Sequence, residues 1–318
     1  MARILVTGCA GFIGSWITQT LIERGSIVCG LDNFETGKRE NIAHLAGNFQ
    51  FIECDLRDAE ATARACHGVD FILHQAALPS VPRSVKDPRS SHTANLDGTF
   101  NLLEGARAAG VQRIVYAASW SAYGNQPGFP RVETMVPMPI APYPVQKLAG
   151  ELYMKSYWQV YGMETVCLRY FNIFGPRQVP DSPYSGVMAK FTLQMMQGER
   201  PTIFGDGEQG RDFTYVENAV SANLLVLQAP AEKVAGRTFN VACGECHTLN
   251  ETFHILADLL EFKEEPIYAP PRTGDISNSL ADITAAREAF GYDPKIGFEE
   301  GLRRTVAWYR EQYAAGKA

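Results

Sequence analysis

The sequence lacks an apolar run that approaches the ~20 residues needed to span a bilayer, and it lacks a block of basic residues. With a net charge of −6, these absences argue against a membrane or nucleic acid as a partner. A signal-peptide pattern is also missing, because the apolar residues Ile4, Leu5 and Val6 end at a glycine-rich turn. We therefore expect a soluble, cytoplasmic protein.

The cysteines give little sign of disulfides or of a metal. Their number, seven, is odd, and most lie in apolar stretches, as reduced core cysteines do. The segment 243–247 (Cys-Gly-Glu-Cys-His) has the spacing of a c-type haem attachment motif and could form half of a zinc site. However, haem attachment requires export, and the sequence has no second cysteine pair to complete a zinc site. We expect no metal.

The beginning of the chain predicts a dinucleotide-binding unit. Residues 3–7 have the pattern of a buried strand, helical periodicity follows Gly14, and Gly8, Gly11 and Gly14 form the turn between them. Such glycines let the backbone approach a pyrophosphate, which the helix N-terminus attracts through free N–H groups and a positive dipole. The spacing is G-x-x-G-x-x-G rather than the commoner G-x-G-x-x-G.

A second strand over residues 27–31 ends at Asp32. A carboxylate there can accept hydrogen bonds from both ribose hydroxyls of adenosine and repels a 2′-phosphate, which favours NAD over NADP. Lys38 and Arg39 follow, and we expect them on a solvated loop. The strand, the glycine turn, the helix and the acid together predict NAD as the cofactor.

The pattern of the following residues predicts an α/β fold, a doubly wound parallel sheet of the Rossmann type. We expect strands over 48–53, 69–74, 114–117 and 163–169, and helices over 59–65, 95–106 and 147–161. Ligands of such folds bind at the carboxyl ends of the strands. The glycine turn, Asp32, Asp55, Gln75 and Ser119 all fall at those ends.

Three side chains near predicted strand ends have more than one interpretation. Asp55 could reach the amino group of adenine or cap the helix over 59–65. Arg83 could contact a phosphate or be a surface charge, and we expect His74 to be a satisfied core histidine.

The sequence becomes richer in turn formers after Arg169. We therefore predict a NAD-binding Rossmann domain over 1–169 and a smaller substrate-binding lobe over 170–318, some segments of which return to the first domain. Loop arginines at positions 177, 211 and 272 could bind a diphosphate through their fork-shaped guanidinium groups, or they could form surface salt bridges.

Tyr143 and Lys147 are four residues apart, so in a helix they lie one turn apart on the same face. A phenol ionises near pH ~10, too high for a base at neutral pH, and a nearby ammonium favours the phenolate. We therefore expect Lys147 to lower the pKa of Tyr143 toward the range of a general base. Ser119 follows a predicted strand and could bridge a substrate oxygen and the phenolate. We predict that these three residues share one site.

The helix predicted over 147–161 is apolar on more than one face. This surplus of apolar surface requires cover. The same helix of a second subunit could supply it across a two-fold axis, and so could the carboxyl-terminal part of the same chain. We favour a homodimer.

Together these motifs resemble those of the extended short-chain dehydrogenase/reductase family over nearly the whole chain. The motifs are T-G-x-x-G-x-x-G from Thr7, Asp32-Asn33, the loop 119–124, Y-x-x-x-K from Tyr143, R-Y-F-N from Arg169, G-R-D-F from Gly210 and R-x-G-D from Arg272. Within the family, the chain is most similar to the UDP-hexose 4-epimerases, and among them to the branch that handles N-acetylated sugars.

The resemblance implies a role for each matching residue. NAD would be held by Gly8, Gly11, Phe12, Ile13, Gly14, Asp32, Asn33, Asp55, Leu56, Gln75, Ala76, Ala77, Asn95, Tyr143, Lys147 and Tyr170. The UDP-sugar would be held by Arg83, Ser119, Ser121, Asn172, Val187, Phe204, Arg211, Arg272, Asp275 and Ser279. Among these, Phe204 would pack near uracil, and Ser279 matches the position that limits the hexose pocket. A serine there should admit a 2-acetamido group.

The resemblance also implies the reaction, an inversion of C4 of a UDP-hexose through a 4-keto intermediate, with Ser119, Tyr143 and Lys147 as catalytic residues. Relatives that dehydrate or decarboxylate generally carry an acid just after the catalytic Ser or Thr, where this chain has Trp120 and Ser121. One alternative is a UDP-glucuronate 4-epimerase, with a cation supplied by an arginine at position 83 or 177. The other is a non-catalytic NAD-binding sensor.

Two residues depart from the pattern of the family. Trp120 replaces a small residue and could narrow the sugar site or point away from it. Pro144 directly follows Tyr143. Proline is tolerated in a first helical turn, but it should restrict the backbone of Tyr143 toward extended geometry and so shift the phenolate.

Overall fold

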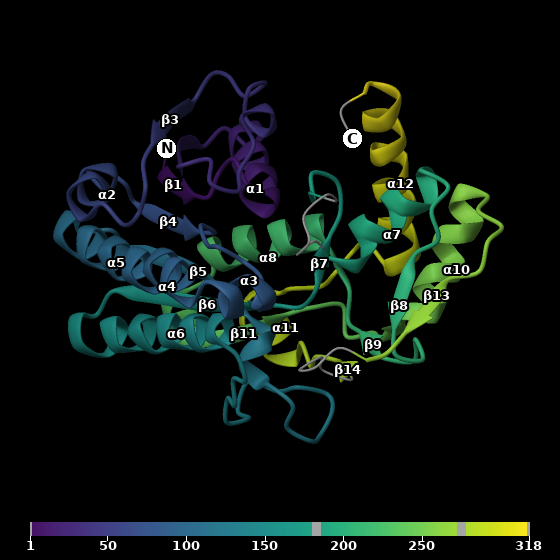
Figure 1. Ribbon diagram of the computed structural model, residues 1–318. Helices are drawn as coiled ribbons and strands as arrows, with labels where there is room; N and C mark the ends of the chain where they lie inside the picture. Colours follow the sequence, from purple (N-terminus) through teal and green to yellow (C-terminus); the bar gives the residue numbers. More distant parts are fainter. Residues whose placement is uncertain (1, 180–185, 272–277, 317–318) are drawn as a thin grey trace.

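The computed structural model describes residues 2–179, 186–271 and 278–316 (Figure 1). Its centre is a seven-stranded parallel sheet with the strand order β11-β6-β5-β4-β1-β2-β3. The strands are β1 (Arg3–Thr7), β2 (Ile27–Asp32), β3 (Phe49–Glu53), β4 (Phe71–His74), β5 (Arg113–Ser119), β6 (Glu164–Tyr170) and β11 (Arg237–Val241). The chain direction across the sheet reverses between β1 and β4, where a ligand crevice is expected. The predicted fold class is confirmed.

Alternate side chains of each central strand fill two separate cores, because helices cover both faces of the sheet. Ile4 and Val6 of β1 belong to the core that includes α1 and α8, whereas Leu5 belongs to the core that includes α2, α5 and α6. In Figure 1, α5 and α6 run side by side, away from α1. These helices are α1 (Phe12–Glu23), α2 (Ala59–Ala65), α5 (Gly98–Ala109), α6 (Pro142–Tyr161) and α8 (Val216–Gln228).

The helix that we predicted from Asn95 begins earlier in the chain. After α3 (Val81–Lys86), α4 (Pro88–His92) leads through a π-helical turn at Thr93–Asp97 into α5. The start is set by Asp87, whose carboxylate accepts a hydrogen bond from the N–H of Ser90 at 3.1 Å.

Tyr143 has helical backbone geometry, because α6 begins at Pro142. The expectation that Pro144 would hold Tyr143 in an extended conformation is therefore wrong. The N–H of Tyr143 donates a hydrogen bond to Oγ of Ser84 in α3, and this anchor fixes the first turn against the local steric preference.

The carboxyl-terminal lobe has its own aromatic core, built around Phe174, Phe213 and Phe298. Its elements are β7 (Ile173–Phe174), α7 (Val187–Met196), β8 (Thr202–Phe204), β9 (Gly210–Arg211), β10 (Thr214–Tyr215), β12 (His247–Thr248), α10 (Leu249–Leu260), β13 (Ile267–Ala269), β14 (Asn278–Ser279) and α12 (Phe298–Ala314). Two later segments, β11 and α8, pack on the main sheet instead, together with α9 (Ala231–Val234) and α11 (Thr284–Phe290). Among the described residues, no helix is long and apolar enough to cross a membrane.

Candidate active site

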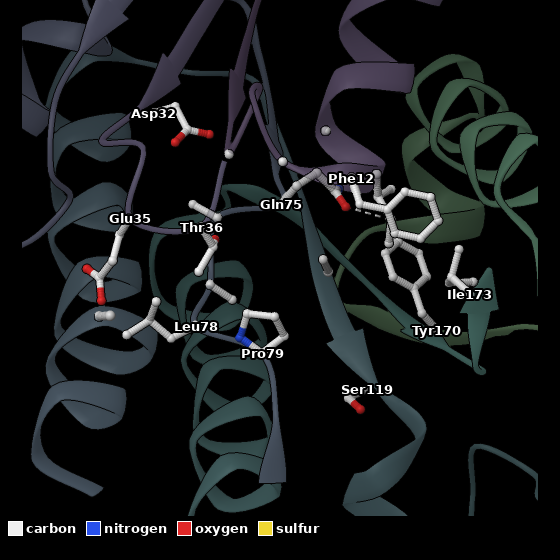
Figure 2. A pocket seen from close by; sticks show the side chains of 18 of the residues that line it. Phe12, Asp32, Glu35, Thr36, Gln75, Leu78, Pro79, Ser119, Tyr170 and Ile173 are labelled. Atoms are coloured by element: carbon white, nitrogen blue, oxygen red, sulfur yellow. Dashed lines mark hydrogen bonds between the residues drawn. The ribbon is translucent and has the colours of Figure 1, made fainter. Parts of the chain in front are cut away.

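A cavity of about 570 Å³ opens at the carboxyl ends of the sheet strands. Figure 2 shows Asp32 near one end of it and Ser119 near the other. Its lining includes the predicted cofactor residues Gly8, Gly11, Phe12, Ile13, Gly14, Asp32, Asn33, Asp55, Leu56, Gln75, Ala76, Ala77, Tyr143, Lys147 and Tyr170. The predicted substrate residues Arg83, Ser119 and Asn172 line it as well. The volume falls within the range of small-molecule and cofactor sites.

The glycine turn of this cavity requires glycine for two physical reasons. Gly8 has a φ of +70°, and a Cβ there would lie 2.8 Å from the backbone nitrogen of Ala76. A Cβ on Gly14 would lie 2.0 Å from the carbonyl oxygen of Gly8. The turn leads into α1, whose N-cap, Gly11, has no side chain to occupy the first N–H groups. These groups suit a pyrophosphate, so the cavity fits a dinucleotide.

Asp32 lies at the end of β2 with 6% of its surface exposed. Its carboxylate accepts hydrogen bonds from the N–H groups of Ala10 at 2.9 Å and Phe34 at 2.8 Å, while burial raises its pKa. The two cations that follow already face carboxylates: Lys38 pairs with Glu40, and Arg39 pairs with Glu53.

The carboxylate of Asp55 is largely occupied by protein groups. Arg57 Nε donates to it at 2.9 Å and Asn33 Nδ2 at 2.8 Å, and chiefly the Arg57 hydrogen bonds lower the pKa of Asp55 to about 2. Arg57 also donates to Glu35, another residue of the cavity wall. The sequence analysis missed both residues. The alternative role of Asp55 as a helix cap is wrong, because Asp58 caps α2.

Asn95 does not line the cavity, contrary to its predicted role as a direct cofactor contact. It is 1% exposed, and its side chain bonds the N–H and the carbonyl oxygen of Leu78 at 2.7 and 3.1 Å. Its Nδ2 also donates to Gln146 Oε1 at 2.9 Å. Because Leu78 lies in the cavity wall (Figure 2), Asn95 shapes the site through that backbone.

A polar network orients Tyr170, which lines the cavity beside Phe12 and Ile173 (Figure 2). The Tyr170 hydroxyl donates to Gln75 Oε1 at 3.1 Å and accepts a hydrogen bond from Nδ2 of Asn223, a fully buried residue of α8. Nothing in the sequence pattern distinguished Asn223, because one polar residue on a helix is ordinary and its partners are distant in the chain.

Ser119, Tyr143 and Lys147 line the same cavity. Ser119 ends β5, and its Oγ lies 2.8 Å from Ser121 Oγ. Tyr143 and Lys147 occupy successive turns of α6, and Lys147 Nζ donates to the carbonyl oxygen of Ala117 at 2.8 Å. Ser121 does not line the cavity directly, but its N–H donates a hydrogen bond to Oγ of Ser119.

Burial dominates the ionisation of this group. It raises the pKa of Tyr143 to about 12, against which only the hydrogen bond with Ser119 acts. It also lowers the pKa of Lys147 to about 8. The expectation that Lys147 brings the pKa of Tyr143 down toward the range of a general base is therefore wrong. Desolvation of the phenolate outweighs the ammonium, whose hydrogen bond goes to Ala117.

Trp120 combines the two orientations that the sequence left open. Its ring stacks on Phe171 with 5.8 Å between ring centroids, and it also lines the cavity beside Ser119. The Trp120 ring is therefore a fixed part of the cavity wall on the side of Ser119.

A second cavity, of about 260 Å³, continues from the first under the carboxyl-terminal lobe. The predicted substrate residues Val187, Phe204 and Arg211 line it, and Asn172 borders both cavities. Ser279 lies behind Asn172 and is fully buried, and its Oγ accepts hydrogen bonds from Asn172 Nδ2 at 2.9 Å and from the N–H of Asp212 at 3.1 Å. The predicted residues Arg272 and Asp275 lie outside the described part of the chain.

Arg177 is not available for a substrate anion. Its guanidinium donates to Ser15 Oγ and Gln19 Oε1 and lies 4.3 Å from the ring of Trp16, all in α1. Of the two cations considered for a glucuronate carboxylate, Arg83 alone lines the cavity.

The segment 243–247 forms a loop without a metal-ligand geometry. The His247 ring stacks on Phe298 at 4.1 Å, and its Nδ1 lies 2.9 Å from Glu251. Cys243 and Cys246 are free thiols. Across the described residues, no group of three or more His, Cys, Asp or Glu side chains could hold a metal.

Comparison with known proteins gives one consistent result. The NAD dependent epimerase/dehydratase family matches residues 4–242. The UDP-glucose 4-epimerase of Mycolicibacterium smegmatis is 38% identical over 315 residues, which are 98% of this chain and 99% of that protein. Two crystal structures, each 39% identical, cover 98% of this chain and 99% of their own. They are UDP-glucose 4-epimerase from Thermotoga maritima with UDP-glucose, at a TM-score of 0.93, and UDP-N-acetylglucosamine 4-epimerase from Methanobrevibacter ruminantium with UDP-N-acetylmuramic acid, at 0.92.

Proposed function

The chain belongs to the NAD dependent epimerase/dehydratase family, and from this we propose that it inverts C4 of a UDP-hexose. The substrates are UDP-glucose and UDP-galactose, and also UDP-N-acetylglucosamine and UDP-N-acetylgalactosamine. The observation that carries the proposal is the convergence of Ser119, Tyr143 and Lys147 in a dinucleotide cavity that runs on into a second cavity. The cofactor is NAD, which fits the glycine turn and the buried carboxylate of Asp32.

The chemistry of the chain's own residues follows from one base that acts twice. Tyr143, as the phenolate, accepts the proton of the C4 hydroxyl, with Ser119 donating a hydrogen bond to the same oxygen and the Lys147 ammonium favouring the ionised phenol. When bound, NAD supplies the acceptor that takes a hydride from C4 and returns it. Between the two hydride transfers, the 4-keto sugar rotates in the site. Tyr143 then returns the proton to the C4 oxygen.

The phenolate needs more than Lys147, because burial raises the pKa of Tyr143 to about 12. The positive charge of an oxidised nicotinamide, if bound beside Tyr143, would lower this pKa and so favour the phenolate.

The second cavity supports a nucleotide substrate. Arg211 and Phe204 in its wall offer a cation for a diphosphate and an aromatic face for a base. The Ser279 side chain, whose hydroxyl accepts a hydrogen bond from Asn172, is small and so leaves room for a 2-acetamido group on this side of the hexose site. Trp120 and Ser121 leave the loop after Ser119 without an acid, which supports epimerisation over dehydration.

A substrate panel tests the function. The purified protein, without added NAD, is incubated separately with UDP-glucose, UDP-N-acetylglucosamine and UDP-glucuronate, and the products are resolved by chromatography. We expect conversion of the first two. Conversion of UDP-glucuronate alone would favour the rival substrate, for which Arg83 is the cation considered that lies in the cavity wall. No turnover with retained NAD would favour a non-catalytic sensor.

We also propose that two chains form a homodimer through α5 and α6. Leu152 and Val160 of α6 are 61% and 67% exposed, and Phe100 of α5 contacts Tyr153 at the surface. Where the carboxyl-terminal part of the described chain reaches this helix, Gly236 lies against the ring of Trp158. A second copy would bury the remaining apolar surface.

A further inference from the structure

A buried ion pair lies directly behind the proposed catalytic lysine. Glu151 of α6 accepts hydrogen bonds from Arg169 of β6, with 3.0 Å between Oε1 and Nε and 2.7 Å between Oε2 and Nη2. The side chains are 5% and 4% exposed. Glu151 follows Lys147 by four residues, so the two lie on the same face of α6. Buried ion pairs are not a general source of stability, because both charges lose their hydration.

The surroundings of Lys147 supply few other charges. Its Nζ bonds to the Ala117 carbonyl oxygen and lies 4.8 Å from the centre of the Tyr116 ring. The titratable groups around it are His74 from β4, Tyr116 from β5, Cys167 and Arg169 from β6, and Tyr143 and Glu151 from α6.

Most of these groups are neutral at physiological pH. Burial lowers the pKa of His74 to about 3, and it raises the pKa values of Tyr116 and Cys167 well above their usual range. Burial also lowers the pKa of Lys147, and the charge of Glu151 is the largest influence that acts in the opposite direction. Without that charge, the pKa of Lys147 would be lower still.

We propose that Glu151 is a positioning residue for the reaction: held in place by Arg169, its carboxylate keeps the Lys147 side chain charged beside Tyr143. Arg169 fixes the carboxylate through two guanidinium nitrogens, so the negative end of the pair faces α6. The consequence for catalysis rests on the proposed function, whereas the charge state of Lys147 does not.

The test compares Glu151→Gln with a matched control, Glu164→Gln, in the full-length protein as purified. Both changes replace a carboxylate that pairs with an arginine of the sheet. Glu164 is the first residue of β6, at the end remote from Lys147, and accepts a hydrogen bond from Arg113 Nε at 2.7 Å. The pKa of Lys147 is measured by heteronuclear NMR on lysine-labelled protein, with Lys147→Met identifying its resonance.

We expect Glu151→Gln to lower the measured pKa of Lys147 by about one pH unit and Glu164→Gln to leave it unchanged. An unchanged pKa in Glu151→Gln overturns the proposal. The pH dependence of kcat gives a second measurement, in which the upper limb should move to lower pH by a similar amount in Glu151→Gln only. If wild-type protein turns over no UDP-sugar, the proposed function fails while the NMR result still decides the role of Glu151.

A second variant keeps the test decisive if Glu151→Gln does not fold, since an unpaired Arg169 would remain buried. The double variant Glu151→Gln/Arg169→Gln removes both charges. Glu151 lies on the same helix as Lys147, whereas Arg169 lies on β6. We therefore expect the loss of the carboxylate to dominate, so that the pKa of Lys147 still falls, but by less than in Glu151→Gln. A value equal to or above that of wild type overturns the proposal.

Discussion

The backbone nitrogen of Tyr143 lies 3.0 Å from Oγ of Ser84, and the two residues are 59 positions apart in the chain. Pro142 and Pro144 flank Tyr143, so its N–H is the one backbone donor in this tripeptide. Ser84 is fully buried, and its hydroxyl donates in turn to the carbonyl oxygen of Val81 at 2.8 Å. α3 therefore caps the first turn of α6 and fixes the backbone position of Tyr143, the proposed base.

We predict that Ser84→Ala destabilises the protein by about 1 kcal/mol, the typical cost of a lost helix cap. Because the first turn of α6 loosens, kcat should also fall, while the affinity for NAD changes little. Denaturant unfolding and steady-state kinetics measure the two effects. An unchanged free energy of unfolding together with an unchanged kcat would contradict this role of Ser84.

Tyr143→Phe removes the proposed base but keeps the ring. We expect turnover to fall by more than ~100-fold, with NAD still bound after purification. The control is Tyr153→Phe, which makes the same change on the exposed face of α6. Cofactor content after denaturation and product formation are measured on both variants. A Tyr143→Phe protein of undiminished activity would rule out the base.

Ser279→Tyr adds volume behind Asn172, a residue that borders both cavities. We expect it to reduce kcat/KM for UDP-N-acetylglucosamine more than for UDP-glucose, because the acetamido group needs that space. Ser279→Ala, which loses the hydroxyl without adding volume, is the control for the loss of the hydrogen bonds. Equal losses on both substrates in Ser279→Tyr would count against a size gate.

Asp212 makes the stability of the lobe depend on pH. Its carboxylate is fully buried and accepts hydrogen bonds from the N–H groups of Cys243, Gly244 and Ala281, and burial raises its pKa from 3.8 to about 7. The folded state therefore binds the proton more tightly than the unfolded state does. The corresponding stability is complete below pH 3.8 and is lost as the pH rises through 7, a change on the order of 4 kcal/mol.

Asp212→Asn cannot titrate, so its free energy of unfolding should lack this contribution between pH 4 and 7. The free energy of unfolding of the variant should also be lower by an amount that does not vary with pH, because the amide nitrogen faces a backbone N–H and cannot accept a hydrogen bond from it. Urea unfolding of wild type and variant at several pH values measures the difference. A difference between the two proteins that does not vary across this range would show that Asp212 is ionised throughout.

Leu152→Lys places a charge on the apolar face of α6 and should convert the proposed dimer into a monomer. Val136→Lys, at a residue that is 74% exposed in the loop before α6, serves as the control and should leave the dimer intact. Light scattering coupled to size-exclusion chromatography gives the mass of each protein. A monomeric wild type would contradict the proposal at once.

Much of the cofactor cavity was predictable because its determinants are local. Glycine is required at position 14 because the backbone of Gly8 lies close to it, and at position 8 because the backbone of Ala76, after the adjacent strand, lies close to it. Asp32 ends a strand whose sequence pattern is recognisable. In a helix, the four-residue spacing of Tyr143 and Lys147 likewise places both side chains on one face. For these residues, the spacing along the chain is enough to predict the geometry.

Other features depend on contacts between distant segments, and no local pattern encodes them. Asn223 reaches Tyr170 from α8, and Arg177 turns onto α1 instead of the substrate cavities. The pKa of Tyr143 moved opposite to expectation, because spacing reveals a nearby ammonium but not the degree of desolvation. The motifs of the chain were therefore enough to predict the type of chemistry and the cofactor. Which groups are buried together depends on how distant segments pack, and burial sets the charge of those groups.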